Sequence, residues 1–89
     1  MKCFHIVVSG RVHGVFFRDS TMRKALELGL AGYVKNLSNG TVEIVVEGNE
    51  GKIKELAEFV KNSPGYSNVD DIKITERHVE NFKNFEIRH

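Results

Sequence analysis

The sequence is poor in the residues that cross-link or interrupt a chain. Its 89 residues include one cysteine, one proline and no tryptophan. A single thiol cannot form an intramolecular disulfide, so stability must come from packing, and we expect a cytoplasmic protein. Cys3 is interpreted as a strand residue rather than a nucleophile, because no basic group is fixed beside it by the sequence.

Long hydrophobic runs and an excess of one charge are also missing. No apolar run reaches about 18 residues and the N-terminus has no apolar signal segment, which predicts no membrane span. Thirteen basic and twelve acidic residues are interleaved, a balance that argues against nucleic acid as a partner. The histidines show no metal-ligand spacing, so we expect neither metal nor cofactor. A single monomeric domain over residues 1–89 is predicted.

The first third of the chain predicts a strand followed by a helix. Apolar residues alternate over residues 3–9, with Phe4, Ile6 and Val8 on one side. The pattern becomes helical over residues 19–28, where Asp19 or Ser20 would cap the start and Gly29 would end the helix. The apolar face of this helix would contain Met22, Ala25 and Leu26.

The middle of the chain predicts a hairpin. The extended stretches 31–37 and 41–47 flank Asn39-Gly40, a dipeptide typical of tight hairpin turns. Alternation within the second stretch would turn three side chains toward the core: Val42, Ile44 and Val46.

The last part of the chain predicts a second helix and further strands. Asn49 is a plausible cap, and Pro64 with its neighbours marks the end of the helix. Four apolar positions follow helical spacing: Ile53, Leu56, Ala57 and Val60. Residues 69–79 alternate like a strand, and residues 85–88 predict a short terminal strand.

This order of elements predicts an α+β, ferredoxin-like βαββαβ sandwich. Two helices would cover one face of a mostly antiparallel sheet of four to five strands. Because this fold carries many unrelated functions, function has to be argued from a site.

The stretch Gly10-Arg-Val-His-Gly-Val-Phe-Phe-Arg18 is the best candidate for such a site. A glycine-bracketed turn that leads into a helix can aim several backbone N–H groups at one anion. The planar guanidinium of Arg18 can bind two phosphate oxygens at once. An ordinary turn followed by arginine is the competing interpretation, and spacing alone does not decide between the two.

Two segments carry a resemblance to a known family. The stretch from Gly10 to Arg18 resembles the acylphosphatase signature Gly-x-Val-Gln-Gly-Val-x-Phe-Arg, and Gly29-Leu-Ala-Gly-Tyr-Val-Lys-Asn36 resembles the second motif of that family. The similarity continues through residues 39–43 and 84–88, so that it spans nearly the whole chain.

The resemblance implies hydrolysis of an acyl phosphate without a metal, with inorganic phosphate as product and inhibitor. It implies that Arg18 binds the phosphoryl group and that Asn36 orients the attacking water. Backbone N–H groups of six residues would complete the phosphate site: Arg11, Val12, His13, Gly14, Val15 and Phe16. Without the resemblance, Asn36 would be interpreted as a residue that ends a strand before a turn.

Two residues depart from the family pattern. Tyr33 replaces a frequent tryptophan and is expected to pack at or near the core, whereas His13 replaces a glutamine. If the imidazole of His13 pointed at the phosphate, its protonation would tie substrate affinity to pH. The alternative is a solvent-facing ring that contributes only its backbone N–H.

Two other functions remain open from the sequence. One is a non-catalytic, ferredoxin-like module that binds an anion or a small ligand. The other is a module that handles carbamoyl phosphate, as acylphosphatase-like domains do in some large maturation enzymes. The length of the chain argues against the second.

Overall fold

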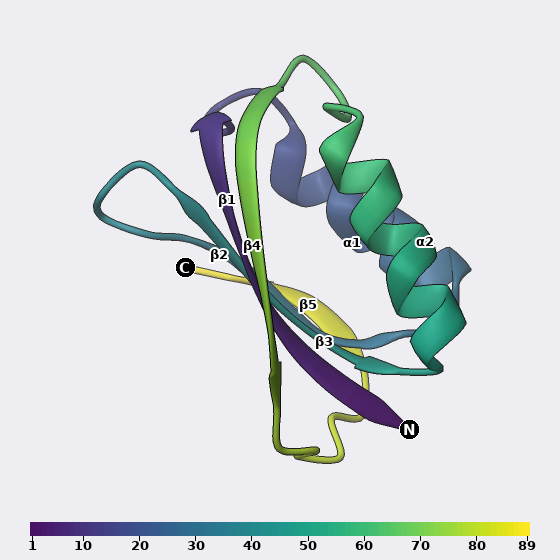
Figure 1. The fold of residues 1–89 in the computed structure, drawn as a ribbon. Helices are drawn as coiled ribbons and strands as arrows, with labels where there is room; N and C mark the ends of the chain where they lie inside the picture. The colour runs from purple at the N-terminus through teal and green to yellow at the C-terminus, as the bar shows by residue number, and fades with distance from the viewer.

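The computed structural model describes residues 1–89 as two helices packed on one face of a five-stranded sheet (Figure 1). The elements are β1 (Lys2–Arg11), α1 (Phe17–Glu27), β2 (Ala31–Asn36), β3 (Val42–Gly48), α2 (Glu50–Lys61), β4 (Asn68–Arg77) and β5 (Phe85–Arg88). The strand order is β4-β1-β3-β2-β5, and only the β2–β5 pair is parallel. The predicted ferredoxin-like α+β fold is therefore confirmed. No helix is long and apolar enough to cross a membrane.

The core lies between the helices and the central strands. Ile6 pairs with Ile44 and Val8 with Val42 across β1 and β3, and all four side chains are buried. Helix α2 covers them with the four apolar residues that its sequence predicts: Ile53, Leu56, Ala57 and Val60. Asn49 caps α2 as predicted, since its side chain accepts a hydrogen bond from the N–H of Lys52.

Helix α1 differs from its prediction at its start and along its buried face. It begins at Phe17, and neither Asp19 nor Ser20 caps it. The buried residues of the helix are Phe17, Thr21 and Ala25, whereas Leu26 is 53% exposed. Once Phe17 enters the core, positions four residues apart share its face. The side chain of Leu26 then lies about 100° around the helix from Ala25, toward solvent.

A segment between β4 and β5 covers part of the sheet face opposite the helices. The buried carboxylate of Glu47 accepts hydrogen bonds from three successive backbone N–H groups, those of Glu80, Asn81 and Phe82, at 2.6, 3.2 and 2.9 Å. Cys3 lies opposite Glu47 in the β1–β3 register and is fully buried. The segment thus gives the sheet a second, smaller protected region.

Tyr33 belongs to this second region and not to the core under the helices, contrary to expectation. Its ring is 6.1 Å from that of Phe82, and its hydroxyl donates to Glu43 Oε1 at 3.1 Å. The guanidinium of Arg88 lies 4.1 Å from the centre of the Tyr33 ring. Successive residues of a strand face opposite sides of the sheet, so buried Val34 takes the core position and Tyr33 the other.

Candidate active site

The loop between β1 and α1 is held by its apolar side chains. Val12, Val15 and Phe17 are buried, whereas His13 and Phe16 between them are exposed. The backbone N–H of Tyr66, in the neighbouring loop after α2, donates to the carbonyl oxygen of Val15 at 3.1 Å. Figure 1 shows these two loops at the same end of the molecule. The core therefore fixes the loop through three of its side chains.

The backbone donors of this loop are not used within the protein. None of the N–H groups from Val12 to Asp19 donates a hydrogen bond to another protein group. The N–H groups of Phe17, Arg18 and Asp19 belong to the first turn of α1. In this turn N–H groups have no partner inside the helix and carry partial positive charge. Eight consecutive donors beside a helix N-terminus form a suitable environment for a phosphate.

Two left-handed residues shape the loop. Gly14 has φ 67°, and Phe16, directly before α1, has φ 62°. Left-handed residues within such a turn allow successive N–H groups to converge on one anion. The conformation costs a residue with a Cβ about 1 kcal/mol, so the backbone at Phe16, directly before the helix, is strained.

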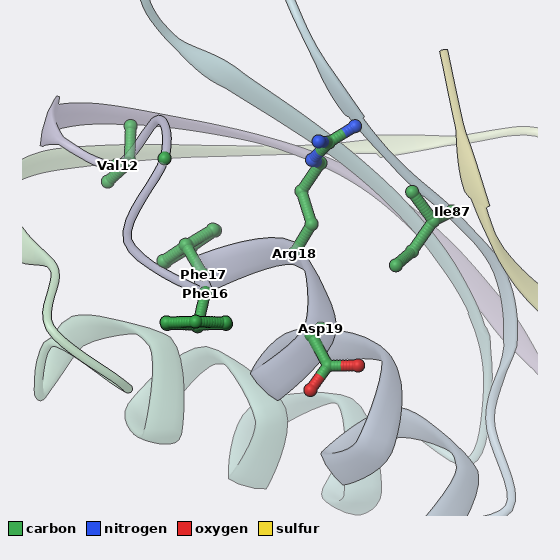
Figure 2. A pocket seen from close by; sticks show the side chains of 7 residues that line it. Val12, Phe16, Phe17, Arg18, Asp19 and Ile87 are labelled. Atoms are coloured by element: carbon green, nitrogen blue, oxygen red, sulfur yellow. The ribbon is translucent and has the colours of Figure 1, made fainter.

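Arg18 projects from the start of α1 beside a cavity of about 300 Å³. The cavity is lined by Val12, Gly14, Phe16, Phe17, Arg18, Asp19 and Ile87. Figure 2 shows the Arg18 side chain leaving the helix on the side away from Asp19, with Ile87 of β5 nearby.

No carboxylate of the protein neutralises Arg18. Asp19 forms its ion pair with Arg23, at 3.0 Å, and not with Arg18. The one hydrogen-bond contact of the Arg18 guanidinium is Nη1 to His89 Nδ1 at 3.5 Å, which is long. Its charge and most of its donors are thus free to bind an anion.

Asn36 is the last residue of β2 and pairs with Val42 of β3. Its Oδ1 is buried and accepts no hydrogen bond from the protein. Asn36 does not line the cavity beside Arg18. A buried carbonyl oxygen without a partner costs free energy unless a ligand or water donates to it.

The structure brings together only some of the residues chosen from the sequence. Val12, Gly14 and Phe16 line the cavity with Arg18, whereas His13 and Val15 do not. Arg11 lies in β1, where it pairs with Asn68 of β4, and so precedes the loop.

The His13 side chain is exposed, as in the second interpretation from the sequence, but it also makes a contact that the sequence did not predict. Its Nε2 lies 2.8 Å from the backbone carbonyl oxygen of Thr41, in the β2–β3 hairpin. The ring is thus directed at the hairpin and not at the cavity.

The unpaired backbone donors do not coincide with the segment from Arg11 to Phe16 that was considered from the sequence. The donors continue past Phe16 into the first turn of α1, because the helix begins two residues before the predicted start. Phe17 was the signal for this, since its spacing to Thr21 and Ala25 is helical. The contact between His13 and Thr41 had no signal in the sequence.

No group of three or more His, Cys, Asp or Glu side chains is close enough to hold a metal ion. The cavity is lined by the guanidinium of Arg18 and the carboxylate of Asp19, and the carboxylate is paired with Arg23. The remaining polar groups are backbone N–H donors, which bind anions rather than cations.

Comparison with known proteins identifies the family of this chain. The family model described as acylphosphatase matches residues 4–87. A relative named acylphosphatase from Coxiella burnetii is 44% identical over 86 residues, covering 97% of this chain and 90% of the relative. The crystal structure of acylphosphatase from Bacillus subtilis superposes with a TM-score of 0.94 at 44% identity, and each chain is covered in full.

A part of one much larger protein is also similar. The crystal structure of full-length HypF in the phosphate- and nucleotide-bound form matches 99% of this chain with a TM-score of 0.93 and 34% identity, over 12% of its own length. The family model and the full-length relatives together show that this chain belongs to the acylphosphatase family.

Proposed function

We propose that the cavity between the β1–α1 loop and β5 is the site at which this acylphosphatase cleaves its substrate. The observation that carries the proposal is the run of unpaired N–H groups from Val12 to Asp19 beside the unneutralised guanidinium of Arg18. Together they supply the positive charge and the hydrogen-bond donors that a phosphoryl group requires. We assign phosphoryl binding to Arg18 and the loop N–H groups, and water orientation to Asn36.

The proposed reaction requires no side chain to act as a strong acid or as a nucleophile. A water oxygen attacks phosphorus, the bond from phosphorus to the acyl oxygen breaks, and a carboxylate and inorganic phosphate leave. Because a carboxylate is a good leaving group, no strong general acid is required. A phosphoryl oxygen takes the proton of the water. Positioning and stabilisation of charge therefore supply most of the rate acceleration.

The proposed role of Asn36 is supported by its unpaired oxygen. Oδ1 can accept a hydrogen bond from the attacking water, and water then satisfies an acceptor that the protein leaves without a partner. An uncharged amide orients the water without adding a negative charge that would repel the phosphoryl group.

Hydrolysis of benzoyl phosphate in the presence of a metal chelator tests this proposal. We expect turnover that inorganic phosphate inhibits and that falls by at least about 1000-fold in Arg18→Gln. Arg77→Gln is the matched control, because Arg77 pairs with Cys3 near the other end of β1 from the loop. Equal activity of the native protein and Arg18→Gln would refute the site, and loss of turnover on chelation would refute metal-independent chemistry.

A second candidate, which the sequence left open, is a site that accepts carbamoyl phosphate within a larger protein. The match to 12% of HypF, a structure described as phosphate- and nucleotide-bound, is consistent with such a setting for this fold. Carbamoyl phosphate is also a mixed anhydride, so the same loop and guanidinium could bind it. A kcat/KM for carbamoyl phosphate above that for benzoyl phosphate would favour this candidate, and the reverse order would favour an ordinary acyl phosphate.

We further propose a cytoplasmic monomer with a single domain over residues 1–89. Fifteen buried side chains form one cluster that includes both helices and four of the five strands, which supports a single folding unit.

A further inference from the structure

One side-chain hydrogen bond joins the two parts of the proposed site. His13 Nε2, on the loop that carries the phosphate donors, lies 2.8 Å from the carbonyl oxygen of Thr41 on the hairpin that carries Asn36. No other hydrogen bond connects residues 12–19 with residues 36–42. The distance between the phosphate donors and the Asn36 amide therefore depends on this contact and on the packing beneath it.

The acceptor of this bond is held firmly by the hairpin. The Thr41 carbonyl oxygen also accepts from the N–H of Leu37 at 2.9 Å, and an oxygen with two lone pairs can accept both bonds. The N–H and hydroxyl of Thr41 donate to Asn39 Oδ1 at 3.1 and 2.6 Å. Leu37 directly follows Asn36 in the chain. The carbonyl oxygen that binds the imidazole is therefore also hydrogen-bonded to the residue next to Asn36.

The chemistry of the partners fixes the direction of the bond. A carbonyl oxygen only accepts, so Nε2 of the ring carries the shared proton and donates. The loop side chain is thus the donor, and the hairpin backbone is the acceptor.

We propose that His13 is a positioning residue, whose hydrogen bond to Thr41 sets the place of the Asn36 amide relative to the phosphoryl group. The proposal rests on the roles assigned above to Arg18 and Asn36. Displacement of a reacting group by about 1 Å can cost about 100-fold in rate, so one bond across the site is enough to matter. Because the His13 side chain does not line the cavity, its loss should change kcat and leave phosphate binding nearly intact.

Two substitutions of His13 separate the hydrogen bond from the bulk of the ring. Gln retains an N–H donor, and Leu has a similar size without one. With benzoyl phosphate we expect His13→Leu to lower kcat about tenfold and His13→Gln to stay within about threefold of the native protein. The inhibition constant of inorganic phosphate should change by less than about threefold in both variants.

The same substitution in Asn36→Ala tests whether His13 acts through Asn36. In the Asn36→Ala background, His13→Leu should lower kcat by less than about twofold, because the amide that His13 positions is absent. Four results would overturn the proposal: native kcat in His13→Leu, equal losses in both backgrounds, equal losses in Leu and Gln, or a parallel loss of phosphate inhibition. Unchanged activity in Asn36→Ala alone would refute the site assignment itself and the proposal with it, while turnover by the native protein would still stand.

Discussion

At the scale of single residues, the unpaired oxygen of Asn36 leads to the sharpest expectation. We expect Asn36→Ala to lower kcat on the order of 100-fold with little change in the KM for benzoyl phosphate, because an interaction that matters mainly in the transition state is lost. Steady-state kinetics at saturating substrate provide the measurement. Ser38→Ala, an exposed change in the same hairpin, is the control. A rise in KM with native kcat would assign Asn36 to substrate binding instead.

Cys3 is the residue whose burial should be visible in the effect of pH on stability. Burial raises the pKa of the Cys3 thiol, and the nearby charge of Glu47 raises it further. Below about pH 8.5 the thiol is neutral in the folded and unfolded states, and its titration does not affect stability. Above that pH the unfolded thiol ionises first, so the free energy of unfolding falls by up to about 1.4 kcal/mol per pH unit until the folded thiol also ionises.

Urea unfolding at pH 7.5, 8.5 and 9.5 tests this expectation, with Cys3→Ala as the comparison. The substitution should lower stability at every pH because it leaves a cavity, but the decline above pH 8.5 should be shallower. The pH range stops at 9.5 because burial, followed by the charge of Glu43, also raises the pKa of Tyr33, whose own effect begins near pH 10. Parallel pH profiles for the two proteins would rule out a contribution from the thiol.

At the scale of elements, Gly32 shows how closely β2 approaches β3. A Cβ at Gly32 would lie 1.9 Å from the carbonyl oxygen of Val45, and φ is 134°. Gly29, just after α1, has φ 72° but no atom within 4 Å of such a Cβ. We expect Gly32→Ala to cost about 3 kcal/mol or more and Gly29→Ala about 1 kcal/mol in urea unfolding. If both variants lost the same free energy of unfolding, the positive φ alone, and not the close approach of the strands, would determine the destabilisation.

The two helices show which local signals suffice for prediction. For α2, the cap Asn49, four apolar positions at helical spacing and the stop at Pro64 all lie within the segment itself, and its buried face was predicted completely. The start of α1 depends on Phe17 entering a core formed by distant strands and on the left-handed backbone of Phe16. Capping preferences of Asp19 and Ser20 could not reveal that tertiary effect.

The residues of the proposed site also differ in how far the local sequence could predict them. The loop before Arg18 could be predicted as an anion site, because glycines, a helix start and an arginine are adjacent in the sequence. The role of Asn36 rests on family resemblance, since nothing local distinguishes it from a residue that ends a strand. The contact of His13 with Thr41 joins residues 28 positions apart and arises only when β1 and the hairpin are assembled.

At the scale of the whole molecule, the shared core predicts cooperative behaviour. We expect one urea transition, with the same midpoint by circular dichroism of the helices and by tyrosine fluorescence, because Tyr33 lies on the face opposite the helices. Size-exclusion chromatography with light scattering should give the mass of one chain at micromolar concentration. Separate midpoints for the two probes would contradict a single cooperative domain, and the mass of two chains would contradict a monomer.

The anchoring of the β1–α1 loop by three buried side chains also bears on heat inactivation. Val12, Val15 and Phe17 belong to the same buried cluster as the helices and strands. The loop therefore cannot release its donors without withdrawing side chains from that cluster. Catalytic turnover and native structure should then disappear over the same temperature interval on heating, with no cooler interval in which a folded but inactive protein accumulates.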